Sequence, residues 1–112
     1  MKSLILKEMT PITYLNEDRI AEQKKRIEEA GLKILDEVIV TASMALFVIE
    51  YSTGPAAWAF YPNSGCEDYI TGARNGEAIR NFTDRAIDQL LRNHNWLNSD
   101  VELLINSRKG KE

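Results

Sequence analysis

Apolar and polar positions divide the chain into segments of different period. The densest apolar segment, residues 38–61, has no charged residue between Glu37 and Glu50. Its β-branched residues and its alternation indicate strands, and the turn residues 52–55 interrupt it. We therefore expect three antiparallel strands over residues 32–41, 45–52 and 57–61, joined in order as a meander.

A helical alternative exists for part of this segment. Between residues 35 and 49, seven apolar positions also fit the spacing of a helix, and Ala42 to Leu46 contains good helix formers. Period alone does not decide between a strand and a helix in a short apolar run. The β-branched residues and the Gly54-Pro55 turn favour strands, so the strand interpretation is preferred.

Helical patterns lie on both sides of this segment. In residues 16–30, Asn16 is a suitable N-cap and Gly31 a suitable C-terminal stop, with a narrow stripe at Ile20, Ala21, Ile27 and Ala30. A wide apolar face follows Gly76 and predicts a helix to about Asn93 that packs on the sheet: Ile79, Phe82, Ala86, Ile87, Leu90 and Leu91.

The remaining segments of the chain, at both ends and between residues 62 and 76, have weaker hydrophobic patterns. Residues 3–8 predict a first strand, and residues 62–76 predict a long loop, since they contain three Gly and one Pro. Ser99 and Glu102 have the spacing of a capping box, which predicts a short helix to about residue 107. A last strand over residues 101–105 is the alternative.

The predicted fold is α+β, with residues 1–112 forming a single domain. A three-stranded antiparallel meander, with an additional N-terminal strand, is covered by two helices and followed by a short C-terminal helix. We expect both longer helices to lie on one face of the sheet.

Composition narrows the class of protein. The chain has 112 residues, 44% hydrophobic and 28% charged, which is typical of a folded globular domain. The net charge of −3 argues against a nucleic-acid interface, which needs a basic surface. One cysteine fits a reducing compartment, the first residues do not show the pattern expected of a signal peptide, and the longest uncharged run is too short to span a bilayer. We expect a soluble cytoplasmic protein that binds neither nucleic acid nor membranes.

The sequence offers little for catalysis. Cys66 stands beside Glu67 and Asp68, whose charges disfavour a thiolate, and nothing in the sequence brings His94 to it. One Cys and one His are too few for a structural zinc site. We expect no catalytic residues, no metal site and no cofactor, and an enzyme is the less favoured interpretation.

Two sets of residues could bind a ligand or a partner. Gly72, Arg74 and Gly76 lead into a helix N-terminus, where free N–H groups favour anions; a simple glycine-rich cap explains the same residues. Trp58, Tyr61 and Tyr69 surround the third predicted strand and could anchor a partner, although aromatic residues also complete a core. If that strand is the sheet edge, it has no charge to protect it.

Three function classes follow. The preferred one is a small non-enzymatic protein-interaction module, such as a regulator, an inhibitor or an immunity-type protein, that binds a macromolecular partner. The second is a small enzyme or a ligand- or anion-binding domain that uses residues 62–76. The third is a subunit of a homodimer whose sheet pairs with a second copy.

Overall fold

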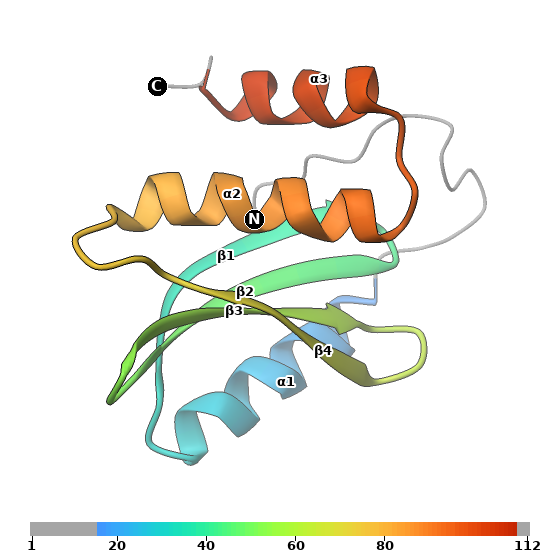
Figure 1. Ribbon diagram of the computed structural model, residues 1–112. Coiled ribbons are helices and arrows are strands. Elements are labelled where there is room, and N and C mark those ends of the chain that lie inside the picture. Colours follow the sequence, from blue (N-terminus) through green and yellow to red (C-terminus); the bar gives the residue numbers. More distant parts are fainter. Residues whose placement is uncertain (1–15, 110–112) are drawn as a thin grey trace.

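The computed structural model describes residues 16–109, and within them the fold is α+β. An antiparallel sheet of four strands lies between helices, in the order β1-β2-β3-β4 (Figure 1). Helix α1 lies on one face of the sheet, α2 lies on the other, and α3 packs on α2. Along the chain the elements are α1 (Glu17–Glu29), β1 (Lys33–Thr41), β2 (Met44–Tyr51), β3 (Gly54–Tyr61), β4 (Cys66–Gly72), α2 (Ile79–Asn93) and α3 (Asn98–Lys109).

Helix α1 begins and ends where the sequence predicts. The Asn16 side chain accepts a hydrogen bond from the Arg19 N–H at 3.1 Å, and Gly31 has a φ of +82°, a conformation that glycine adopts without strain. The buried face differs from the predicted stripe. Gln23 is buried together with Ile20 and Ile27, whereas Ala21 and Ala30 are exposed.

The meander of β1, β2 and β3 is confirmed, and the helical alternative for residues 35–49 is wrong. Val38 pairs with Leu46, and Phe47 pairs with Trp58. Every residue of β2 from Met44 to Ile49 is buried, because both faces of this strand are covered. A strand buried on both faces is apolar throughout, which is why its pattern also fitted a helix.

The prediction of a continuous loop over residues 62–76 is wrong. Residues Cys66–Gly72 form β4, which pairs with β3 through Tyr61↔Cys66 and Trp58↔Tyr69. Consequently β3 is an inner strand, and the expectation that it ends the sheet is also wrong. The fourth strand is therefore β4; the predicted strand over residues 3–8 lies outside the described residues.

The two longer helices cover opposite faces, not one face as predicted. Phe82, Ala86 and Leu90 of α2 are fully buried against the sheet, which confirms the apolar face of this helix. The core on this side continues through Val38, Val40, Leu46, Val48, Ala57, Ala59 and Ile70. On the other side, α1 packs over Ile39, Ala45, Phe47, Ile49 and Phe60. Alternate residues of β1, β2 and β3 thus serve two separate cores.

Helix α3 is held on α2 by apolar and polar contacts. Val101 and Leu104 are buried, and the Arg108 Nε donates to Asp84 Oδ1 at 2.6 Å. The helix starts at Asn98, which puts Leu97 at the N-cap, so Ser99 lies inside the helix and the predicted N-cap is two residues late. The alternative of a last strand over residues 101–105 is wrong.

Candidate functional site

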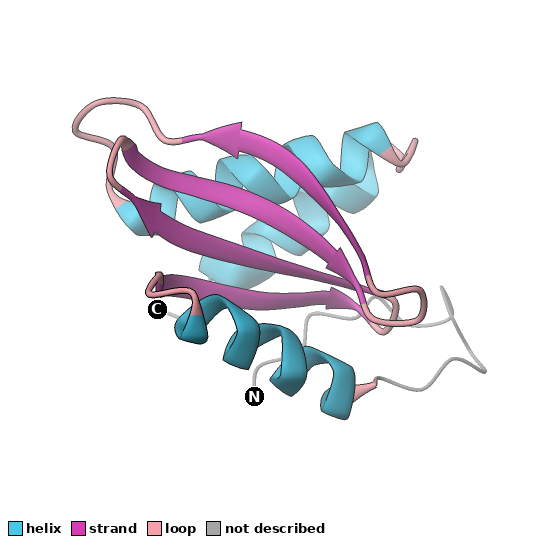
Figure 2. Ribbon diagram, turned by 90° about the horizontal axis from the view of Figure 1, so that it is seen from below, coloured by secondary structure: helices cyan, strands magenta, loops and turns pink. Residues whose placement is uncertain are grey.

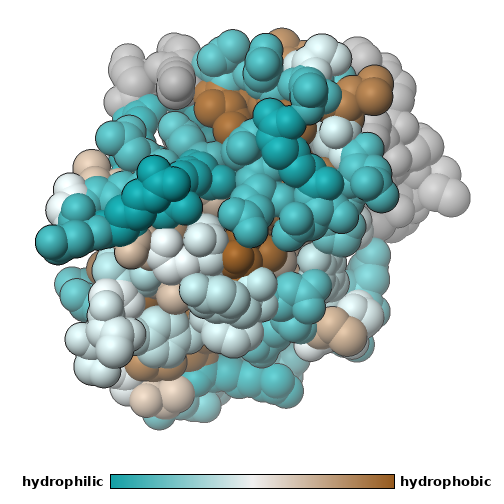
Figure 3. Space-filling view, in the orientation of Figure 1, coloured by the Kyte–Doolittle hydropathy of each residue, from teal (hydrophilic) through white to brown (hydrophobic). Residues whose placement is uncertain are grey.

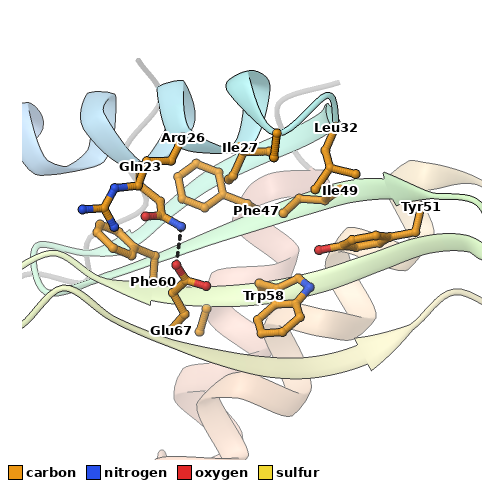
Figure 4. A pocket seen from close by; sticks show the side chains of 12 residues that line it. Gln23, Arg26, Ile27, Leu32, Phe47, Ile49, Tyr51, Trp58, Phe60 and Glu67 are labelled. Carbon is orange, nitrogen blue, oxygen red and sulfur yellow. Dashed lines mark hydrogen bonds between the residues drawn. The ribbon is translucent and has the colours of Figure 1, made fainter.

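A groove lies between α1 and the sheet, on the face opposite α2 (Figure 4). Its volume is about 250 Å³. We call it the α1 groove. Residues from α1, from β2, β3 and β4, and from the connection after α1 line it, among them Gln23, Arg26, Ile27, Leu32, Phe47, Ile49, Tyr51, Trp58, Phe60 and Glu67.

The floor of the α1 groove is aromatic and aliphatic because of strand geometry. Side chains two residues apart point to the same face of a strand, so Phe47, Ile49 and Tyr51 of β2 face α1 together. Trp58 and Phe60 of β3 continue this surface, and Phe60 contacts Phe47 with ring centroids 6.3 Å apart. The groove therefore favours an occupant with apolar surface.

One end of the groove is polar. Gln23 on α1 donates from Nε2 to Glu67 Oε2 on β4 at 2.6 Å, which joins two residues 44 positions apart in the sequence. Arg26, one turn beyond Gln23, also borders the groove, and its guanidinium makes no ion pair or hydrogen bond within residues 16–109. Sequence reasoning missed these three residues. Their only sequence signal was the spacing of Gln23, three residues after Ile20 and four before Ile27, which puts its amide on the same side of the helix as these two residues.

The other end is open beside Trp58 and Tyr69. Their rings contact edge to face, with centroids 5.5 Å apart, and Tyr69 is 57% exposed. Helix α1 follows one margin of the sheet and leaves this part of the face without a helix from the described chain (Figure 2). Trp58 and Tyr69, two of the three predicted anchors, thus share one exposed surface.

The indole N–H of Trp58 is buried and has no hydrogen-bond acceptor in the described part of the chain. Such a group loses its water without gaining a partner, which costs about 1–3 kcal/mol. Figure 4 shows this nitrogen turned toward the end of the groove where Tyr51 lies. The protein therefore tolerates a stability defect at the groove.

The third predicted anchor, Tyr61, lies on the opposite face of the sheet. Its hydroxyl is hydrogen-bonded to His94 Nε2 at 2.9 Å, at the end of α2. Burial, and then the neighbouring Asp68 carboxylate, raise the pKa of the Tyr61 hydroxyl to about 12. Tyr61 therefore connects β3 to α2, and the three predicted anchors do not form one surface.

Cys66 is exposed and pairs across the strands with Tyr61, which also contacts His94. Cys66 and His94 are thus both neighbours of Tyr61. No hydrogen bond joins the Cys66 thiol to His94 in residues 16–109. The geometry gives no support for a catalytic pair.

The predicted anion-binding residues Gly72, Arg74 and Gly76 precede α2, where Glu77 already occupies the region. Its carboxylate accepts from the Arg74 N–H at 2.9 Å and forms an ion pair with Arg85 at 2.8 Å. The hydrogen bond from Arg85 has the largest effect and that from the Arg74 N–H the next, and together they lower the pKa of Glu77 to about 2. A permanent negative charge at this point repels a second anion.

The free side of β4 is partly capped by α2. Arg85 Nη2 donates to the Gly72 carbonyl at 3.0 Å, and Gln89 Nε2 donates to the Ile70 carbonyl at 3.4 Å. These carbonyls would otherwise be open to pairing with another strand. Side chains that cover an edge in this way hinder the addition of a further strand.

Apart from Tyr69, the large exposed hydrophobic side chains among the described residues are Leu97 and Leu103, beside and on α3. Figure 3 shows hydrophobic areas near α3 that are separated by hydrophilic side chains. Single exposed apolar residues of this kind are normal on a protein surface. They supply matched control positions for the groove.

Within the described range, no group of three His, Cys, Asp or Glu residues is placed to hold a metal ion. The helices of that range include none with the length and apolar character needed to cross a membrane. Comparison with protein-family models, with curated proteins and with solved structures finds no match to this chain.

Proposed function

We propose that this chain is a small, non-enzymatic protein-interaction module that binds a segment of a partner protein at the α1 groove. The observation that carries this proposal is that residues 16–109 cover the α1 face of the sheet only in part. An apolar groove opens there beside an aromatic pair, the half-buried Trp58 and the exposed Tyr69. Concave apolar sites with a few polar groups are the usual places where proteins bind ligands and peptides.

The aromatic pair suits the role of an anchor. Trp and Tyr are frequent among the residues that dominate binding energy, because they bury a large area and lose little side-chain entropy. Tyr69 has much of its surface still to bury, and Trp58 forms the groove wall behind it. The unpartnered indole N–H also fits the general rule that local defects gather at functional sites.

The partner segment lies across the face of the sheet and does not extend it as a fifth strand beside β4. The carbonyls of Ile70 and Gly72, which a fifth strand would need, already accept bonds from Gln89 and Arg85. Binding to the face of the sheet leaves these hydrogen bonds in place. It also places a side chain of the segment into the groove.

A display library of linear peptides, panned against the immobilised protein, tests the proposal. Affinities of the selected peptides are then compared among the wild type, Tyr69→Ala and Leu103→Ala. Both positions are exposed to a similar extent, at 57% and 59%, so both variants should fold. We expect a loss of roughly tenfold, ~1.4 kcal/mol, for Tyr69→Ala and no change for Leu103→Ala.

Equal binding by both variants would refute the groove as the docking site. Sedimentation of the free protein tests the competing occupant, a second copy. A dimer that dissociates on Tyr69→Ala would place another copy of this chain at the groove, and the separate partner would then be wrong.

A further inference from the structure

We infer that the partner segment places a long basic side chain, Lys or Arg, in the α1 groove, with its charged end at Glu67. This inference rests on the proposed function and names the chemistry of the partner. It is carried by three observations: the shape of the groove, its aromatic walls and the free capacity of one carboxylate.

The groove is apolar along its length and polar at the end where Glu67 lies. Phe47, Trp58 and Phe60 supply aromatic surface, and the Gln23–Glu67 hydrogen bond spans the polar end (Figure 4). A long basic side chain matches this arrangement, because it is apolar along its length and charged at its end. Its methylene groups pack on apolar surface, while its charged head remains with polar groups.

Glu67 retains hydrogen-bonding capacity for such a head. Gln23 donates to one carboxylate oxygen, and Figure 4 shows the other oxygen turned toward Trp58. No ion pair to Glu67 exists within residues 16–109. A carboxylate beside aromatic rings attracts a cation twice, through its own charge and through the negative faces of the rings.

Other charges near the groove modify this attraction without reversing it. Arg26 is the opposing charge among the residues that line the groove, but its side chain is exposed, and its guanidinium lies beyond Gln23, away from Trp58 (Figure 4). Arg19 adds positive charge beyond the same end, where its guanidinium donates to the Pro62 carbonyl at 3.1 Å. Asp68 follows Glu67 on β4 and adds negative charge on the other face of that strand. The net charge of −3 also favours a basic partner.

The test uses three short synthetic peptides of Gly and Ser that differ only at their central residue, which is Lys, norleucine or Glu. Each is titrated into the full ¹⁵N-labelled chain, and NMR follows the indole N–H signals of its two tryptophans. Trp58 reports on the groove, whereas Trp96, which packs in the core on the α2 side, is the internal control.

We expect the Lys peptide to shift the Trp58 signal and to leave Trp96 unchanged. The norleucine peptide should bind about tenfold more weakly and the Glu peptide not at all. Glu67→Gln, which keeps an acceptor for Gln23, should weaken the Lys peptide about tenfold, and Arg26→Gln should strengthen it severalfold. Raised ionic strength should weaken the Lys peptide alone.

Two outcomes separate this inference from the proposed function. If norleucine and Lys bind equally at Trp58, or if Glu67→Gln changes nothing, the basic side chain is wrong while the groove remains a docking site. If the Lys peptide leaves Trp58 unchanged, the inference is again wrong. The proposed function fails separately, when peptides selected by display bind Tyr69→Ala as they bind the wild type.

Discussion

Replacing Trp58 by Phe should stabilise the protein or leave its stability unchanged, although a large half-buried side chain becomes smaller. The indole is roughly 40 Å² larger than a phenyl ring, so at about 25 cal/mol per Å² the change loses about 1 kcal/mol of apolar burial. Trp58 is only half-buried, which reduces this loss. The edge contact with Tyr69 can be kept by a phenyl ring.

The gain in stability comes from the removal of the indole nitrogen. Removing a buried N–H that has no acceptor recovers about 1–3 kcal/mol of desolvation cost. The expected net effect is therefore a stabilisation of about 0–2 kcal/mol. Partner binding should weaken in the same variant, since the groove wall is altered.

Urea denaturation followed by far-UV circular dichroism measures this change, because tryptophan fluorescence would itself be altered by the substitution. Trp96→Phe is the matched control. Trp96 is also half-buried, but its nitrogen is not a buried donor without an acceptor. It should therefore lose stability. A loss for Trp58→Phe as large as that for Trp96→Phe would refute the reasoning.

Three further predictions concern the other face of the sheet and its flanks. Phe82→Ala removes a fully buried ring from the α2 side and should cost about 3–5 kcal/mol in a thermal or urea melt; a small loss would contradict the packing. Glu77→Gln should cost about 1–3 kcal/mol at neutral pH, since it breaks the charged pair with Arg85. The folded-state pKa of Glu77 is about 2, below its ordinary 4.5, so this contribution is complete above pH 4.5 and disappears as the pH falls toward 2. Melts of variant and wild type should therefore converge in acid, and a constant difference would oppose the assignment. Cys66→Ser should leave the melt within about 0.5 kcal/mol and binding unchanged, because the thiol is exposed; loss of binding alone would implicate it in the function.

Local signals predicted most of the fold. The cap at Asn16, the turn at Gly54 and the apolar face around Phe82 each depend on neighbours in sequence, and all three are confirmed. Strand β4 was missed because an edge strand needs little apolar surface. Only Ile70 is buried in it, and the Gly residues on either side indicate a loop.

The candidate site was predicted only in part, for a physical reason. Sequence period shows which residues share a face, but not which helix covers that face. Trp58 and Tyr69 lie together because β4 pairs with β3. Tyr61 is three residues after Trp58 in β3, and because side chains alternate between the two faces of a strand, it points to the opposite face. Gln23 and Glu67 meet only through tertiary structure, so no local pattern could have joined them.

The order of the strands also governs how the molecule folds. Each strand pairs with its neighbour in sequence, so the sheet forms from short hairpins and needs no crossover. Contacts between neighbours close quickly, since little loop entropy is lost. During synthesis, α1 and all four strands emerge before α2. The strands that carry Val40, Leu46 and Val48 therefore leave the ribosome before the helices that bury these residues.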